Sequence, residues 1–318
     1  MESPRQATYQ LNWKPGKADP RDYKYSSIMR STVALPASVS ARQFVPEVFD
    51  QGQVGSCTGN AGAMVALHRS RKQGRQLYGS RLQLYYDARE LINETGQDAG
   101  AYIRDIYKGM THKGVAPESI WPYIESRVTV KPTPDVYAEA EKTKAEGYHA
   151  VAQDLNELKT CLAEGNIIQF GFIVYSSFMY GQWSKIMPVP AATERAIGGH
   201  SMVLIGYDDA MKCFEAKNSW GVDWKDKGHV WIPYELVTSD MFADFFMLEK
   251  VTPAPAPTPT PDNEKSVVDL RKIILKEKDL ARLSELMILR IGAEMHLNTD
   301  AKKSKSWNCK IIAGALGL

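Results

Sequence analysis

DQGQVGSCTGNAGAMVALHRS, residues 50–70, is the stretch in which glycine-rich punctuation gives way to a run of helix-forming residues. Its alanine, methionine, valine and leucine residues favour a buried helix that begins near Cys57. Unpaired backbone N–H groups and the helix dipole stabilise an anion at a helix start, so the pKa of a thiol there should fall. The sequence therefore predicts that Cys57 carries a reactive thiolate.

The residues around Cys57 are small. Gly55, Ser56, Gly59 and Ala61 leave room for a substrate backbone to approach, which bulky side chains at a helix start would prevent. We therefore expect the thiol to face a peptide-sized opening.

Two apolar stretches further along the chain each border a residue that complements a thiol. GGHSMVLIGYDD, residues 198–209, places His200 ahead of a strand-like run, and Asn218 follows a second such run. Two adjacent strands would bring these residues together. An imidazole can exchange the thiol proton, and a third group can orient the ring through its other nitrogen. His68 lacks this context and is expected late in the first helix as a solvated or capping side chain.

These motifs, in this order, resemble those of the papain-like cysteine peptidases of a bacterial or viral type. QGxxGSC before a helix resembles the family's active-site segment, and KNSWGxxW, residues 217–224, resembles its asparagine segment. The resemblance implies Cys57 as nucleophile, His200 as its proton-exchanging partner and Asn218 as the group that orients the ring. It also implies that the Gln51 amide and the Cys57 backbone N–H stabilise the oxyanion.

The spacing and two substitutions refine the resemblance. His200 lies 143 residues after Cys57 and Asn218 lies 161 residues after it, whereas the family interval is about 130 to 150 residues. A modest insertion between His200 and Asn218 accounts for the excess. Val54 replaces a cysteine that many relatives carry, which removes a customary disulfide partner, and Thr58 stands where an aromatic residue commonly follows the nucleophile. Neither change removes a reacting group.

The resemblance also implies a set of residues that contact the substrate. Trp220 is expected to cover the hydrogen bond between His200 and Asn218. The family's glycine pair that binds the substrate backbone corresponds to Ala99 and Gly100, of which only Gly100 keeps the pattern. The remaining expected contacts are Gly199 on the opposite wall, and Gly171, Gly198 and Ser201 near the pocket for the second residue before the scissile bond.

The order of apolar patterns predicts the fold class. Helical patterns come first and strand-like runs later, which indicates an α+β fold with helices segregated from a sheet. The resemblance implies two lobes, one helical and one with an antiparallel sheet or barrel. We predict an extended arm at 1–34, a peptidase domain at 35–251, a proline-rich linker at 252–262 and a helical tail at 263–318.

Composition limits the partners. Among 318 residues, 39 lysines and arginines face 37 acids, so the net charge of +2 gives no electrostatic reason to expect nucleic acid binding. The four cysteines have neither zinc-site spacing nor the density of a disulfide framework. No stretch is long and apolar enough to span a bilayer, and the start lacks the apolar core of a classical leader. The predicted chemistry needs no metal or organic cofactor. The sequence does not decide whether the protein is located in the cytoplasm, in a virion or outside the cell after export without a leader.

The predicted function is a cysteine endopeptidase that hydrolyses a polypeptide substrate through an acyl-enzyme at Cys57. Two alternatives remain open at this point. One is an inactive peptidase-like binding or scaffold module. The other is a cysteine amidase or transferase that uses the same intermediate on cell-wall peptides or isopeptides.

The two ends of the chain are given separate hypotheses. The arm is extended and precedes the expected domain start, so it is expected to regulate access to the cleft, although it is too short for the family's usual helical propeptide. The tail is expected to bind a partner, to self-associate or to pack back on the peptidase, because an amphipathic helix on a spacer needs a surface that covers its apolar face.

Overall fold

The computed structural model describes residues 9–29 and 34–252. Its helices are α1 (Cys57–Lys72), α2 (Arg81–Glu90), α3 (Ile103–His112), α4 (Pro134–Ala140), α5 (Leu155–Ala163), α6 (Ser176–Tyr180) and α7 (Tyr234–Val237). Short 3₁₀ turns are η1 (Tyr25–Ser27), η2 (Arg42–Phe44), η3 (Glu125–Arg127) and η4 (Glu141–Thr143). The strands are β1 (Trp13–Lys14), β2 (Ser38–Ser40), β3 (Ala101–Tyr102), β4 (Ala145–Ala150), β5 (Ile168–Tyr175), β6 (Ala196–Asp208), β7 (Cys213–Lys217), β8 (His229–Pro233) and β9 (Phe242–Val251).

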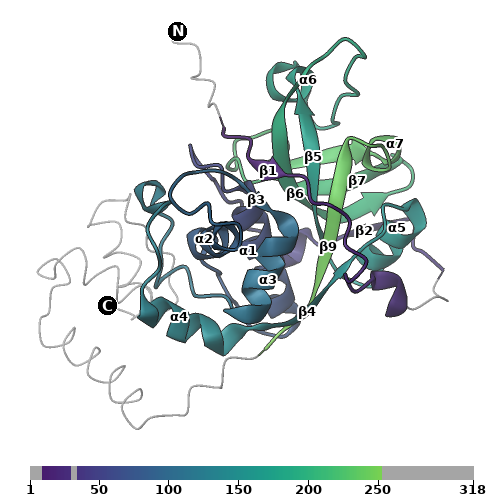
Figure 1. Ribbon diagram of the computed structural model, residues 1–318. Coiled ribbons are helices and arrows are strands. Elements are labelled where there is room, and N and C mark those ends of the chain that lie inside the picture. Colours follow the sequence, from purple (N-terminus) through teal and green to yellow (C-terminus); the bar gives the residue numbers. More distant parts are fainter. Residues whose placement is uncertain (1–8, 30–33, 253–318) are drawn as a thin grey trace, which may run out of the picture. The chain divides into compact units, whose positions relative to one another are not determined.

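The predicted α+β class is confirmed, with α1 to α4 preceding the six strands β4 to β9 that make up most of the sheet (Figure 1). The main sheet has the order β4-β9-β5-β6-β7-β8, and β2 adds to the end of β6; every one of these pairs is antiparallel. Within the described residues this sheet stays open instead of closing into a barrel. The predicted linker, apart from Thr252, and the predicted tail lie outside the described residues.

Helix α1 is enclosed by its neighbours, as its apolar composition predicts. A Cβ atom at Gly59 would lie 2.6 Å from the Arg81 carbonyl oxygen, so this glycine allows α1 and α2 to approach closely. The side-chain amide of Gln169 on β5 donates to the Thr58 carbonyl oxygen at 3.0 Å, which ties the start of α1 to the sheet. The expectation of a solvated His68 is wrong: the side chain is buried, and burial lowers its pKa to about 3.

The sheet is covered on both faces, and the register of β5 shows how. Phe170 and Phe172 point into one apolar cluster, which also holds Leu158 of α5. Gln169 and Ile173 alternate with them and face the other side, where α1 and α3 pack. Because both faces are buried, β5 is apolar along most of its length instead of alternating with polar residues.

The N-terminal arm crosses the domain between its two lobes. Strand β1 pairs in parallel with β3, with Trp13 opposite Ala101, and a parallel bridge joins Asn12 to Gly199 on β6. Figure 1 shows this purple segment between β3 and the adjoining ends of β5 and β6. Trp13 and Lys14 of the predicted arm are therefore held as a strand, whereas Tyr25–Ser27 form the 3₁₀ turn η1.

Candidate active site

Cys57 is the first residue of α1, at the position where the sequence predicts a helix start. Its side chain is fully buried, and backbone N–H groups of Ser201, Asn12 and Thr58 direct hydrogen bonds toward it. Ser201 follows His200 on β6, so the sulfur lies beside the backbone of the strand that carries the candidate base. Sequence-distant residues thus meet where the helical lobe contacts the sheet.

His200 and Asn218 are brought together by neighbouring strands. β6 and β7 pair antiparallel, and Asn218 directly follows β7. The Nε2 atom of His200 lies 2.7 Å from Oδ1 of Asn218, and Oδ1 also accepts the Ser219 backbone N–H at 2.8 Å. Since Oδ1 accepts both bonds, Nε2 carries the ring proton, and Nδ1, which has no hydrogen-bond partner among the described residues, is left as an acceptor.

Trp220 covers this pair. Its ring lies 4.6 Å from the His200 ring, centroid to centroid, and it is itself buried. On its other side Tyr9 of the arm stacks on it at 4.6 Å with an interplanar angle of 5°. An apolar cover of this kind excludes water, which strengthens the bond between His200 and Asn218.

Gln51 is held from several sides. Its Oε1 accepts the Ser219 hydroxyl at 2.9 Å, and its Nε2 donates to the Val54 carbonyl at 3.0 Å and to the Gln10 carbonyl at 3.2 Å. The amide that the sequence assigns to an oxyanion is thus directed at a backbone carbonyl of the arm. A peptide oxygen can be recognised at this position.

The predicted substrate-contact glycines surround the arm. A Cβ at Gly171 would lie 1.9 Å from the Trp13 ring, one at Gly198 2.6 Å from Leu11 and one at Gly199 2.5 Å from the Trp13 carbonyl oxygen. A Cβ at Gly100 would lie 2.0 Å from the Asn12 carbonyl oxygen. These positions accept an extended peptide only because they lack side chains.

Ser201 is placed differently from the glycines. Its hydroxyl donates to the Phe170 carbonyl oxygen at 3.0 Å and accepts from the Gln169 amide at 3.2 Å, so its side chain points into the sheet. Its contribution to the site is the backbone N–H that is directed at the Cys57 sulfur.

Burial shifts the pKa of the Cys57 thiol upward, whereas the sequence predicted a downward shift. It raises the pKa of Cys57 to about 11, against the opposing effect of the three backbone N–H groups, and it lowers the pKa of His200 to about 4. The expectation of a lowered Cys57 pKa is therefore wrong for this arm-covered state. With these pKa values the thiol and the imidazole are both neutral near pH 7, because burial removes the water that a thiolate and an imidazolium need.

Asp98 is a site residue that the sequence motifs do not single out. Its carboxylate accepts the Gly55 N–H at 2.7 Å and the Tyr85 hydroxyl, and that hydroxyl accepts the Gly100 N–H at 2.8 Å. The network joins the loop before Cys57 to Gly100, which lies against the Asn12 carbonyl oxygen of the arm. Its only sequence signal is an acid two residues before Gly100, which a solvated loop would show equally well.

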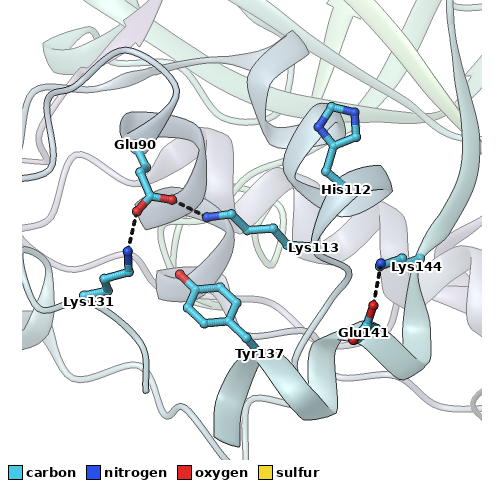
Figure 2. Close-up of a pocket in the computed structure, with 7 residues that line it drawn as sticks. All are labelled: Glu90, His112, Lys113, Lys131, Tyr137, Glu141 and Lys144. Atoms are coloured by element: carbon cyan, nitrogen blue, oxygen red, sulfur yellow. Dashed lines mark hydrogen bonds and ion pairs between the residues drawn. The ribbon is translucent and has the colours of Figure 1, made fainter. Parts of the chain in front are cut away.

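A separate hollow of about 360 Å³ lies on the helical lobe and contains none of the predicted site residues. Figure 2 shows its lining, which is Glu90, His112, Lys113, Lys131, Tyr137, Glu141 and Lys144. Glu90 pairs with Lys113 and Lys131, and Glu141 pairs with Lys144. The lysines of this hollow are therefore already neutralised by acids.

Two kinds of site are absent from the part of the chain that the structure covers. In residues 9–29 and 34–252 there is no cluster of three or more histidine, cysteine, aspartate or glutamate side chains suited to a metal ion. Over the same ranges no helix has the length and apolarity that crossing a bilayer requires.

A buried cysteine at a helix start lies next to the strand that carries an imidazole bonded to an asparagine, an arrangement that suits a cysteine peptidase. Comparison with known proteins agrees with this. Residues 35–241 match the model of the family described as papain family cysteine protease. An uncharacterized peptidase C1-like protein of Acanthamoeba polyphaga mimivirus is 34% identical over 237 residues, which is 70% of this chain and 74% of the relative. Cathepsin B-like CP2 of Giardia intestinalis is 27% identical over 196 residues, 58% of this chain and 63% of that protein.

The solved structure of xylellain, a cysteine protease from Xylella fastidiosa, is 32% identical and has a TM-score of 0.72, covering 79% of this chain and 99% of that one. The chain belongs to the papain family of cysteine proteases, and it is a papain-like cysteine peptidase. The bacterial and viral similarities confirm the predicted branch type.

Proposed function

We propose that the chain is an endopeptidase that cleaves polypeptides through a thioester at Cys57, and that its arm keeps it latent. The observation that carries the proposal is the path of residues 9–14. They run through the cleft past Cys57, with contacts to Trp220 on one side and to Gly171 on the other. The arm enters the cleft at one end and leaves it at the other. Such a cleft can hold the middle of a polypeptide, which an endopeptidase requires.

The proposed reaction uses four groups in sequence. His200 Nδ1 takes the thiol proton, and the Cys57 sulfur attacks a substrate carbonyl. The Gln51 amide and the Cys57 backbone N–H stabilise the oxyanion. The imidazolium then gives its proton to the leaving amine, and His200 later activates the water that hydrolyses the thioester. Asn218 keeps the ring oriented throughout.

The direction of the arm supports latency. Tyr9 stacks on Trp220, which covers His200, whereas Trp13 lies beside Gly171 and Asp244. A substrate must place its leaving amine, on the C-terminal side of the scissile bond, near the imidazole that protonates it. The arm therefore runs opposite to a substrate. It directs the Asn12 N–H at the sulfur where a substrate would offer a carbonyl carbon.

A thiol-directed active-site probe and an internally quenched peptide blocked at both ends test both parts. We expect Tyr9→Ala/Trp13→Ala in the full chain, hereafter the arm-loosened protein, to label at Cys57 at least about tenfold faster than the unaltered chain, because two aromatic contacts are lost. Tyr23→Ala is the matched control, since Tyr23 belongs to the same arm and is 75% exposed. Equal labelling rates in all three proteins would reject latency.

The endopeptidase assignment is tested by a separate result of the same assays. Cleavage of the doubly blocked peptide by the arm-loosened protein, lost in Cys57→Ala, supports it. A labelled protein that cleaves nothing would instead support the binding-module alternative. Products that carry an added amine in place of water would support a transferase.

A further inference from the structure

Gln169 is a fully buried amide on β5, a strand inside the main sheet. Its sequence neighbours Ile168 and Phe170 are apolar, and its Oε1 faces α1, where a Cβ at Gly62 would lie 3.7 Å away. Oε1 has no hydrogen-bond partner among the described residues. An amide buried with one end unpaired costs free energy that an apolar side chain of the same size would not. The N–H groups of the amide must therefore account for its presence.

Both of these N–H groups form hydrogen bonds, and their acceptors lie on different elements. Nε2 donates to the Thr58 carbonyl oxygen on α1 at 3.0 Å and to the Ser201 hydroxyl on β6 at 3.2 Å. Because a carbonyl oxygen only accepts, the nitrogen end of the amide must face Thr58. The Ser201 hydroxyl gives its own proton to the Phe170 carbonyl oxygen at 3.0 Å, which leaves its lone pairs for Gln169. One side chain thus ties α1 to β6.

The two acceptors occupy corresponding places in the candidate site. Thr58 directly follows Cys57, and Ser201 directly follows His200. The backbone N–H groups of Thr58 and Ser201 are also directed at the Cys57 sulfur. A displacement of either residue would therefore move a reacting side chain together with an N–H group that stabilises the thiolate.

We propose that Gln169 is a positioning residue, which holds the start of α1 and the strand β6 at the separation that proton exchange between Cys57 and His200 requires. This inference rests on the proposed function, since it takes these two residues as the reacting pair. Proton exchange needs the two groups within hydrogen-bond reach, and a misplacement of about 1 Å costs about 10²-fold in rate. Gln169 acts through the residues that follow the reacting pair, without contact with the substrate.

Gln169→Met in the arm-loosened protein tests this role, because methionine has a similar length and no N–H group. We expect kcat for the doubly blocked peptide to fall by about tenfold to a hundredfold and KM to stay within about threefold, since the reacting groups move and the cleft does not. The pH midpoint of Cys57 alkylation by iodoacetamide should rise by about one unit, because Thr58 and Ser201 then stabilise the thiolate less.

Gln83→Met is the matched control, since Gln83 is a second fully buried amide that joins two segments. Its Nε2 donates to the Gly114 carbonyl oxygen at 3.1 Å, and its Oε1 accepts the Ala116 N–H at 3.0 Å, all within the helical lobe. Thermal unfolding of both variants measures the loss of stability. The control should lose Tm to a similar extent and keep kcat and the alkylation midpoint of the arm-loosened protein.

Ser201→Ala is a smaller change that removes one of the two acceptors, and it decides the question if Gln169→Met does not fold. We expect a loss in kcat of about threefold to tenfold and a midpoint shift in the same direction. An unchanged midpoint in Gln169→Met and Ser201→Ala, or a loss in kcat no larger than in Gln83→Met, would overturn the positioning role.

Alkylation separates this role from the endopeptidase assignment, because it needs no turnover. If the arm-loosened protein labels at Cys57 and cleaves no peptide, the endopeptidase assignment fails. A midpoint raised in Gln169→Met and not in Gln83→Met would then still support the positioning role. Cleavage that Gln169→Met leaves unchanged would reject the positioning role and keep the endopeptidase.

Discussion

Cys57 and Cys161 have the same exposure and different surroundings. Both thiols are fully buried and free, and burial raises the pKa of each. Cys161 lies within α5, inside the apolar cluster behind the sheet. Cys57 starts a helix, receives three backbone N–H groups and is covered on one side by residues 9–14 of the arm. Cys161 is buried by the core of the domain, whereas Cys57 is buried partly by a separate segment. We therefore expect the two thiols to differ in reactivity.

The largest expected difference between the two cysteines is in catalysis. In the arm-loosened protein, Cys57→Ala should lower peptide cleavage on the order of 10⁴-fold or more, because the nucleophile is lost. Cys161→Ala should leave kcat/KM within about twofold, since Cys161 lies in α5 within the apolar cluster and is not among the site residues. Cleavage assays on both variants measure this, and a comparable loss in Cys161→Ala would contradict the comparison.

The next expected difference is in pH dependence. The pKa of Cys57 is raised to about 11 by burial, so in the unaltered chain its alkylation rate should increase with pH up to a midpoint near that value. Loosening the arm readmits water and stabilises the thiolate, which moves the midpoint down toward or below the ordinary value of 9.0. Rates of iodoacetamide reaction from pH 5 to 11, resolved by peptide mapping, test this. A Cys57 midpoint that stays in place would show that the arm does not control the thiol.

A smaller effect is expected from the hydrogen bonds that position the cleft. Asp98→Ala in the arm-loosened protein leaves the Gly55 N–H and the Tyr85 hydroxyl without their acceptor, so kcat/KM should fall about tenfold. Asp98→Asn retains one acceptor oxygen and should recover part of the loss. Separate kcat and KM values distinguish positioning from general destabilisation, because a loss of Tm with unchanged kinetics would contradict a positioning role.

The smallest expected effect is on stability. Cys161→Ala should lower the free energy of unfolding by about 1 kcal/mol, the cost of a small cavity in a packed core. Urea denaturation of the full chain, compared with Cys213→Ala, provides the measurement. An increase in stability would show that Cys161 is poorly packed, and the contrast with Cys57 would then rest on chemistry alone.

Much of the candidate site follows from the amino-acid sequence, because its residues have local signatures. The start of α1 at Cys57 follows from small residues and helix formers, and the pairing of His200 with Asn218 follows from two apolar strands that each border a polar residue. Resemblance to the family assigns Gly171, Gly198 and Gly199, and all three lie against the arm. That these residues catalyse and bind as predicted stays a prediction for the cleavage and labelling assays.

Other features have no local signature. His68 has the sequence context of a surface residue, yet it is buried beside the Phe44 ring, because α1 is enclosed on more sides than its sequence period shows. Asp98 and Asp244 resemble ordinary loop or strand acids. Their hydrogen bonds to Gly55 and Trp13 connect residues 43 and 231 positions apart.

The sequence by itself determined the start of a helix at Cys57, the order of helices before strands and the family, since each depends on residue types at short range or in a set order. Only the tertiary structure decided the raised pKa of Cys57, the direction of the arm and the hydrogen bond between Trp13 and Asp244. The physical reason is that desolvation and strand pairing depend on which distant segments come together. The sequence includes the Cys57 thiol and the arm, but only packing places residues of the arm over the thiol.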